Sequence, residues 1–263
     1  MKKIMLLISL ALVVFACSPG LDDSTYFAHD FVQGNDTLPY RIMYPKGYKA
    51  NKKYPLILFL HGSGERGNDN QSQLIHGGAL FQSDSLRTLH QAIVLFPQCP
   101  KGISWTHRIK EQQADSKDWV FQFPLDQGPT WPTASVNALV DSLVKAHEVD
   151  PKQLYIGGLS MGGIGTLEFL QRWPNKYSAA FVICGANDAS LADAYQKTPI
   201  WFFHGGKDDV VPNKYSRQIY NRIVELNPQT PSKYTLYPED NHNSWDDAFA
   251  EPGLYEWLFQ FHK

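Results

Sequence analysis

The sequence has 263 residues, 43% of them hydrophobic, and 24 Lys and Arg residues nearly balance 26 Asp and Glu residues, for a formal net charge of −2. This length and composition predict one globular domain with one substantial core. The charge balance excludes no fold, but it argues against a nucleic-acid binder, which needs a basic surface to neutralise phosphates.

The first residues have the pattern of a bacterial export signal. Two lysines precede an apolar run from Ile4 to Phe15, which is too short to span a bilayer comfortably. The run leads into "VFAC", which resembles a lipobox, whose Cys becomes the lipidated first residue of the mature protein. We therefore predict a lipoprotein signal over 1–17 with Cys17 lipidated, a tether over 18–25, and an exported protein that faces the periplasm or the cell surface. Its only membrane contact would be the lipid anchor. An ordinary cleaved signal with an incidental cysteine is the alternative.

The next apolar segments predict the start of an α/β sheet. Two strands at 26–32 and 38–45 flank the turn-like "QGND", which favours an antiparallel hairpin. Continuous apolar runs at 54–62 and 91–98 are typical of strands buried on both faces of a parallel sheet. A helix is expected between them, near 83–90.

The stretch from Cys99 to Pro132 is rich in Trp and polar residues and shows no clean period. We expect either a surface loop or an insertion that covers a substrate. Cys99 and Cys184 remain after Cys17; they either pair in an oxidising compartment or stay buried as free thiols. No His/Cys cluster has the spacing of a zinc site, so neither a metal nor another cofactor is expected.

After this stretch, helices and strands alternate regularly. Apolar residues at helical spacing between Val136 and Val144 predict a helix over 133–148, with Thr133 as its N-cap. The predicted elements that follow are strand 153–158, a helix from Ser160, strands 179–185 and 199–205, helix 214–226, strand 233–238 and helix 252–262. Repeated βα units predict an α/β fold with a mostly parallel central sheet, an antiparallel N-terminal hairpin and helices on both faces.

The segment "YIGGLSMGGIGT" places five glycines around Ser160, between a predicted strand and a predicted helix. Its core, from Gly158 to Gly162, fits G-x-S-x-G, in which a sharp turn lifts a nucleophilic serine above a sheet while small neighbours avoid collisions. The alternative is a Gly-rich turn in which Ser160 only caps the following helix.

A serine nucleophile needs a base, and the base needs an orienting carboxylate. Two later predicted strands are followed by loops that carry Asp208 and Asp209, and then His242. The order Ser, Asp, His is the order of α/β-hydrolases. A turn residue at Asp208 and a solvated loop residue at His242 are the alternatives, but chance would have to supply all three positions together. His61 and His204 are expected to bind loop backbone instead of acting as bases.

A developing oxyanion needs hydrogen-bond donors, each of which contributes roughly 3 to 4 kcal/mol. The residue after the nucleophile supplies one backbone N–H, from Met161. The second is expected from the loop after an early central strand, and "LFLHGSGERG" has that form, with Ser63 as the predicted donor.

Five blocks of the sequence carry a family resemblance: "LHGSGERG", "PQCPKG", "GLSMGGIGT", "HGGKDDVVP" and "HNSWDDAF". In this order they resemble the α/β-hydrolase superfamily, and within it secreted esterases related to dienelactone hydrolases and the phospholipase/carboxylesterase family. The resemblance implies one α/β-hydrolase catalytic domain over 26–263. It also selects Asp208 over Asp209 as the acid and His242 as the base. Relatives usually carry Gly before this His, where the present chain has Asn241.

The resemblance implies a serine carboxylic-ester hydrolase that works through an acyl-enzyme. Its substrate would be a small-molecule or polysaccharide ester, with feruloyl or acetyl esters of plant polysaccharides expected first. Aromatic residues of the long loop, with Trp105 and Trp131 foremost, are predicted substrate contacts by stacking, and ordinary packing is the alternative. A serine peptidase of the same superfamily and a catalytically silent glycan-binding lipoprotein are the alternative functions.

Overall fold

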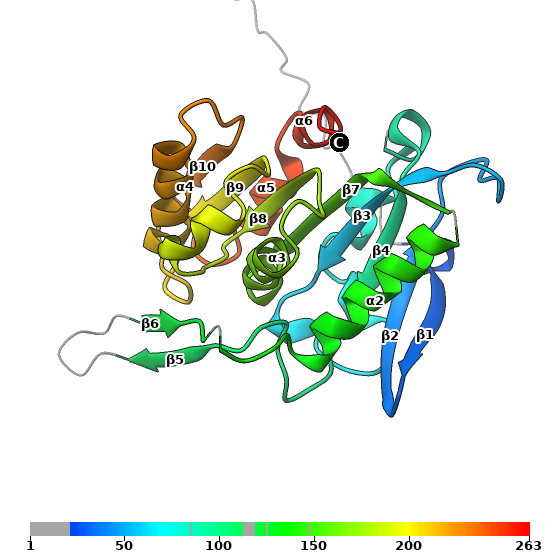
Figure 1. Cartoon of the computed structure of the whole chain (residues 1–263), viewed down its shortest axis with the longest axis horizontal. Helices are drawn as coiled ribbons and strands as arrows, with labels where there is room; N and C mark the ends of the chain where they lie inside the picture. The colour runs from blue at the N-terminus through cyan, green and yellow to red at the C-terminus, as the bar shows by residue number, and fades with distance from the viewer. Residues whose placement is uncertain (1–21, 85, 113–118, 125, 147) are drawn as a thin grey trace, which may run out of the picture.

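The computed structural model describes residues 22–84, 86–112, 119–124, 126–146 and 148–263. The predicted signal and its lipidation site, Cys17, lie outside the described residues. A central sheet of eight strands has the order β1-β2-β4-β3-β7-β8-β9-β10 (Figure 1). The strands of this sheet are β1 (Phe27–Gln33), β2 (Asp36–Met43), β3 (Tyr54–Leu60), β4 (Ile93–Pro97), β7 (Val149–Leu159), β8 (Ala179–Ile183), β9 (Ile200–Gly205) and β10 (Lys233–Tyr237).

The remaining elements surround the sheet. The α-helices are α1 (Gly78–Phe81), α2 (Trp131–Lys145), α3 (Met161–Arg172), α4 (Lys214–Leu226), α5 (Trp245–Ala250) and α6 (Leu254–Leu258). The short 3₁₀ turns are η1 (Asp23–Thr25), η2 (Ser63–Glu65), η3 (Ser72–Leu74) and η5 (Ala189–Ala194), and η4 (Leu86–His90) is a π-helical turn. None of the described helices combines the length and the apolar character needed to cross a bilayer.

The strand directions confirm the predicted fold class. β1 pairs antiparallel with β2, and β2 pairs antiparallel with β4, whereas β4, β3, β7, β8, β9 and β10 are parallel neighbours. The carboxyl ends of the parallel strands therefore meet at one edge. In an open α/β sheet, ligands bind outside this edge.

Side-chain alternation along the central strand β3 separates two apolar layers. Leu56 and Leu58 point to one face, where they join a core cluster with Val136 of α2, Leu167 of α3 and Ile219 of α4. Each large apolar side chain that is fully buried contributes about 1.5–3 kcal/mol. Helices α2, α3 and α4, the three longest of the described helices, cover this face.

The other face of the same strand has a separate cluster. Ile57 and Phe59 pack there with Phe81 of α1, Ala248 of α5 and Leu258 of α6. β3 is thus buried on both sides, as its unbroken apolar sequence predicts. The helices on both faces fix the sheet edge from which the candidate site projects.

The helix predicted over 133–148 differs from the structure at its start. Helix α2 begins at Trp131, and Thr130 occupies the N-cap position, so the prediction of Thr133 as N-cap is wrong. Pro132 extends the helix toward the N-terminus, because a proline in the first turn needs no N–H acceptor. The hydroxyl of Thr133 instead donates to the carbonyl of Trp105.

Three further local features were not predicted as they occur. Where a helix was expected near 83–90, the structure has the π-helical turn η4, and the short helix α1 precedes that range. The aperiodic stretch contains a two-stranded hairpin of β5 (Ile109–Gln112) and β6 (Trp119–Gln122), paired antiparallel. All four residues of β5 are exposed, so no apolar alternation could signal it. Helix α5 is only six residues long, too short for a periodic pattern.

Glycine at the β7–α3 corner is required by contact. A Cβ at Gly162 would lie 1.8 Å from the carbonyl oxygen of Leu60, whereas a Cβ at Gly64 would meet nothing within 4 Å. We expect Gly162→Ala to lower the free energy of unfolding by about 3 kcal/mol or more, since backbone on both sides must move. Urea unfolding of Gly162→Ala beside the control Gly64→Ala measures this. Equal stability of the two variants would contradict the packing described here.

Candidate active site

Ser160 stands at the corner between β7 and α3 in a backbone conformation that is rare for a residue with a side chain. Its φ is 51° and its ψ is −115°. Such strained positions cost on the order of 1–3 kcal/mol and persist only where the surroundings fix them. Here the N–H of Ser160 donates to the carbonyl of Ile183 at 2.9 Å, and its carbonyl accepts from the N–H of Ile164 at 3.0 Å. Its side chain makes no capping hydrogen bond to the helix, so the capping alternative is excluded.

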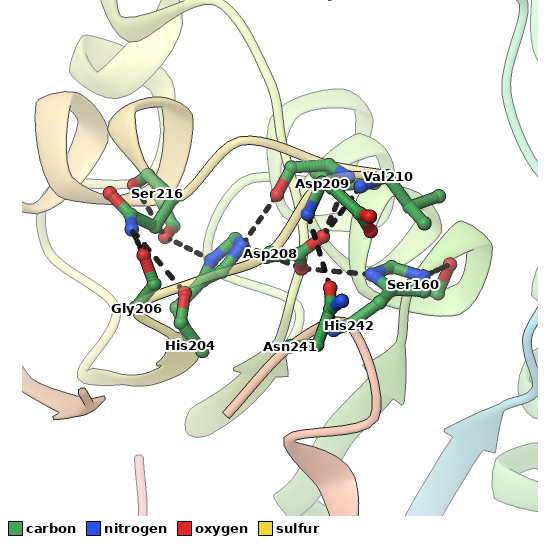
Figure 2. Close-up of polar contacts among 12 residues, drawn as sticks. Ser160, His204, Gly206, Asp208, Asp209, Val210, Ser216, Asn241 and His242 are labelled. Atoms are coloured by element: carbon green, nitrogen blue, oxygen red, sulfur yellow. Dashed lines mark hydrogen bonds and ion pairs between the residues drawn. The ribbon is translucent and has the colours of Figure 1, made fainter. Parts of the chain in front are cut away.

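The hydroxyl of Ser160 belongs to a chain of three side chains (Figure 2). Its Oγ lies 2.8 Å from Nε2 of His242, and Nδ1 of His242 lies 2.8 Å from Oδ2 of Asp208. The three residues follow β7, β10 and β9, at the carboxyl edge of the sheet. The Asp208 side chain is fully buried, whereas that of His242 is 18% exposed. The predicted juxtaposition of serine, histidine and aspartate is therefore present.

The surroundings of Asp208 hold its carboxylate ionised. Burial alone raises its pKa, but hydrogen bonds from His204 and His242 and from the N–H of Val211 outweigh burial, so the pKa lies well below the ordinary value. Oδ1 accepts from the N–H groups of Val210 and Val211 at 3.0 and 2.9 Å. With its acceptor fixed in this way, Asp208 orients the His242 ring so that Nδ1 carries the proton and Nε2 faces Ser160 as an acceptor.

His204 is a second histidine at Asp208. Its Nε2 lies 2.8 Å from the carbonyl of Val211 and 3.2 Å from Oδ2 of Asp208, and its Nδ1 lies 2.6 Å from Oγ of Ser216. Both neighbours of Nε2 are acceptors, which assigns the proton to Nε2. The expectation that His204 binds loop backbone is confirmed, but its contact with Asp208 was not predicted.

Asn241 joins the two loops that carry the acid and the base. Its Oδ1 accepts from the N–H of Asp209 at 3.2 Å and from the N–H of His242 at 2.7 Å. Asp209 itself is exposed and, among the described residues, offers the site only this backbone contact, consistent with the selection of Asp208. The departure from Gly at this position thus adds a link between β9 and β10 loops that glycine cannot make.

The loop after β3 lies beside Ser160 on its other side. A Cβ placed on Gly62 would be 3.7 Å from Cβ of Ser160, so little space separates the two segments. Ser63 follows as the first residue of η2, and Met161 is the first residue of α3. N–H groups in the first turn of a helix have no intrahelical acceptor. The arrangement leaves the oxyanion roles of Ser63 and Met161 as predictions.

His61 fixes the shape of this loop as a neutral ring. Its Nε2 accepts from the N–H of Cys99 at 2.9 Å, so its Nδ1 carries the proton and donates to the carbonyl of Gly62 at 2.6 Å. Burial lowers the pKa of His61 to about 4. The expectation that His61 binds backbone is therefore confirmed.

The neutral state of His61 predicts an acid-sensitive fold. An unfolded histidine takes up a proton below about pH 6.5, whereas His61 in the folded protein does so only near pH 4. Protons therefore favour the unfolded state in this window, and we expect the free energy of unfolding to fall by about 3 kcal/mol as the pH drops from 6.5 to 4. Urea unfolding of the wild type and of His61→Gln at a series of pH values isolates the part of this loss that is due to His61. Parallel pH profiles of the two proteins would contradict it.

Trp105 was predicted to contact substrate, and this prediction is wrong. Its side chain is completely buried, and its Nε1 donates to the carbonyl of His61 at 3.1 Å. The ring also fills the space over Gly165, where a Cβ would lie 2.6 Å from Cβ of Trp105. Trp131 is partly buried against the same core cluster, and a substrate contact for it stays a prediction.

The two cysteines that could have paired are both free thiols and both buried. Cys184 lies beside the site, where its Sγ, a carboxylate oxygen of Asp208 and a ring nitrogen of His242 all lie within 4.8 Å of one another. Burial raises the pKa of the Cys184 thiol well above its ordinary value. Because metals bind the thiolate, and because Asp208 and His242 already bind each other, this group fits a metal poorly.

The hairpin β5–β6, which sequence patterns did not reveal, packs against segments that carry the candidate site. Phe121 of β6 shares a buried apolar cluster with Ile164 of α3, Ala186 and Val211. Its backbone N–H donates to the hydroxyl of Tyr215 at 3.0 Å. The hairpin is therefore attached to the first turn of α3 and to the loop that carries Asp208.

Comparisons with known proteins identify a family and similar folds. A model of the Phospholipase/Carboxylesterase family matches residues 47–252. A bifunctional acetylxylan esterase/xylanase of Neocallimastix patriciarum is 29% identical over 157 residues, which cover 60% of this chain and 20% of that protein. The crystal structure of a thermostable esterase is 31% identical with a TM-score of 0.78 and covers 91% of this chain, which spans 64% of that one. A ferulic acid esterase has the same fold at 16% identity, with a TM-score of 0.63, and covers 89% of this chain and 95% of its own.

The chain thus spans less than two thirds of both the acetylxylan esterase/xylanase and the thermostable esterase. The family match, in contrast, includes the elements that carry Ser160, Asp208 and His242. The chain therefore belongs to the phospholipase/carboxylesterase family of α/β-hydrolases.

Proposed function

We propose that the protein is a serine carboxylic-ester hydrolase that works through an acyl-enzyme. The observation that carries this proposal is the hydrogen-bonded chain from Ser160 Oγ through the His242 ring to the buried carboxylate of Asp208. A hydroxyl at a strained strand-to-helix corner, a base and an ionised orienting group are the components of nucleophilic catalysis at an acyl carbon. Membership of the phospholipase/carboxylesterase family supports the same chemistry.

The reaction follows from the proton positions. Ser160 Oγ attacks the ester carbonyl carbon while Nε2 of His242 accepts the hydroxyl proton. The bond to the alkoxy oxygen then breaks, and His242 returns the proton to the departing alcohol. Water attacks the acyl-serine in the second half, His242 accepts a proton from it, and the proton returns to Ser160 Oγ as the carboxylic acid leaves. Asp208 stabilises the imidazolium in both halves.

The negative charge that develops on the carbonyl oxygen needs donors on the opposite side of the nucleophile from the base. The backbone N–H groups of Met161 and Ser63 belong to the two segments that meet at Ser160, so we assign them this role. Both are backbone groups on structured turns, and His61 braces one of these turns. Donors fixed in this way need no reorganisation when the charge forms.

We assign the substrate to acetyl or feruloyl esters attached to plant polysaccharides. The similarity to an acetylxylan esterase/xylanase over 60% of this chain supports the acetyl ester, and the family resemblance of the sequence supports both. We also place the protein outside the cytoplasm as a lipoprotein anchored through Cys17, on the strength of the signal pattern over 1–17.

Hydrolysis of four substrates by mature protein tests the assignment: p-nitrophenyl acetate, methyl ferulate, acetylated xylobiose and alanine p-nitroanilide. We expect turnover of p-nitrophenyl acetate and of at least one of the ferulate and xylobiose esters, with much slower release of p-nitroaniline. Faster cleavage of the anilide than of every ester would replace the esterase with a peptidase. No turnover of any ester would contradict the proposal.

Asn241 is expected to support the rate without touching the reacting atoms. Asn241→Gly, which introduces the residue usual in relatives, removes the bonds to Asp209 and His242 N–H groups. With hydrogen bonds of about 0.5–1.5 kcal/mol each, we expect kcat to fall roughly threefold to tenfold while KM changes little. Initial-rate kinetics on p-nitrophenyl acetate measure this. A change confined to KM would show that Asn241 acts on substrate binding instead.

A further inference from the structure

A cavity of about 490 Å³ opens between the hairpin β5–β6, the 3₁₀ turn η5 and helix α4. Its lining includes Phe121, Gln122, Phe123, Asp188, Tyr215 and Gln218. The volume falls within the range of about 300–1,000 Å³ that is usual for small-molecule sites. The chemistry described above uses none of these side chains.

The cavity adjoins the catalytic residues through its wall. Phe121 packs in one buried cluster with Ile164 and Val211. The N–H of Val211 donates to Asp208, and the N–H of Ile164 donates to the carbonyl of Ser160. The cavity wall therefore packs against the segments that carry Ser160 and Asp208, and none of Ser160, Asp208 and His242 lines the cavity itself. A substrate that is bound at Ser160 and extends toward α4 would enter this space.

The hairpin is attached to the acid loop and to α4 by polar contacts as well. Lys110 of β5 donates through Nζ to the carbonyl of Val210 at 3.3 Å. The Tyr215 hydroxyl accepts from the N–H of Phe121 at 3.0 Å and lies 3.3 Å from the carbonyl of Trp119. These contacts join both strands of the hairpin to the body of the protein, so the cavity has a fixed wall.

The lining combines flat apolar rings with polar groups. The rings of Phe121 and Phe123 are nearly parallel, with centroids 6.5 Å apart and an interplanar angle of 12°, and Tyr215 meets Phe121 edge-on. Gln122 and Gln218 are exposed, and within the described part of the chain their side-chain amides have no hydrogen-bond partner. Asp188 adds an exposed carboxylate.

We propose that this cavity binds the sugar ring on the alcohol side of the ester, a proposal that rests on the function proposed above. A pyranose ring presents C–H groups on its faces, which pack on aromatic rings, and hydroxyls at its edge, which bond to amides and carboxylates. A phenolic acyl group has few hydroxyls with which to bond these exposed amides and this carboxylate, which would stay bonded to water. Asp188 repels an anionic group and Lys110, whose Nζ lies 5.4 Å from the Phe121 ring centroid, attracts one, so the two charges together give no preference for an anion. We therefore expect the alcohol group of the preferred ester to be a neutral glycan.

A pair of acetyl esters with the same acyl group tests the assignment. Acetylated xylobiose carries the sugar, and p-nitrophenyl acetate lacks it. Phe123→Ala removes one stacking ring and Gln218→Ala removes one amide on the exposed face of α4, while Phe27→Ala on the exposed strand β1 is the matched control. We expect Phe123→Ala to lower kcat/KM for acetylated xylobiose roughly tenfold and Gln218→Ala roughly fivefold. Rates with p-nitrophenyl acetate should stay within about twofold of wild type.

The outcomes separate the two proposals. Ester hydrolysis that persists in Ser160→Ala overturns the proposed function, whatever the cavity variants do. If hydrolysis depends on Ser160 but Phe123→Ala and Gln218→Ala lower kcat/KM equally for both substrates, the sugar assignment alone is overturned. The same holds if the two variants lower kcat/KM for neither substrate. A direct measurement is an NMR titration of the Ser160→Ala protein with unesterified xylotetraose, which gives the binding affinity. We expect saturable binding that weakens roughly tenfold when Phe123→Ala is added, and undiminished binding would also overturn the assignment.

Discussion

Ser160→Ala is expected to reduce kcat for ester hydrolysis by on the order of 10⁴-fold to 10⁶-fold, because no other group takes over attack on the carbonyl carbon. The hydroxyl makes its hydrogen bond to His242 and none to the helix it precedes. Its removal should therefore leave the fold and its stability almost unchanged. Initial rates with p-nitrophenyl acetate, together with thermal unfolding of the same preparation, measure both effects.

Ser142→Ala is the matched control, since Ser142 lies exposed on α2 and, among the described residues, its hydroxyl bonds only to the carbonyl of Leu139. It should keep wild-type activity. Retention of most ester hydrolysis by folded Ser160→Ala would show that another group or a bound water carries the reaction. The acyl-enzyme mechanism would then be wrong.

Asp208→Asn is expected to lower kcat roughly 10⁴-fold while the chain stays folded. The buried carboxylate accepts from His242 Nδ1 and so keeps Nε2 free to accept the Ser160 proton. An amide can donate to Nδ1 instead, which favours the ring form whose proton lies on Nε2, and that form cannot act as the base. Kinetics between pH 5 and 9 measure the loss.

Asp209→Asn supplies the matched control one residue away. Asp209 is exposed and contributes only its backbone N–H, which the substitution retains. It should change kcat less than about twofold. A larger loss in Asp209→Asn than in Asp208→Asn would transfer the acid role to Asp209 and contradict the geometry.

The strands and the triad could be predicted because their signals are local. An unbroken apolar run marks β3 as buried on both faces, and G-x-S-x-G marks a strand-to-helix corner around Ser160. The order of motifs then places Asp208 and His242 at the same sheet edge, since parallel strands end together. Each of these inferences needs only neighbouring residues and the direction of the strands.

The features that were missed depend on packing between distant segments. Trp105 is aromatic and lies in a polar stretch, but only the tertiary fold buries it under His61 and Gly165. The hairpin β5–β6 has an exposed strand and joins the site through Phe121, whose partners come from three other segments. In the sequence, Asn241 stood out only as a departure from the family pattern. Its two hydrogen bonds could not be inferred without the folded structure.

Covalent labelling tests whether Ser160 is an activated nucleophile. Folded protein is treated with a fluorophosphonate, and peptide mass spectrometry locates the adduct, with Asp208→Asn as a protein in which the nucleophile is present but not activated. We expect one adduct on Ser160, formed rapidly in the wild type and much more slowly in Asp208→Asn. An unlabelled Ser160, or a main adduct on another residue, would contradict it.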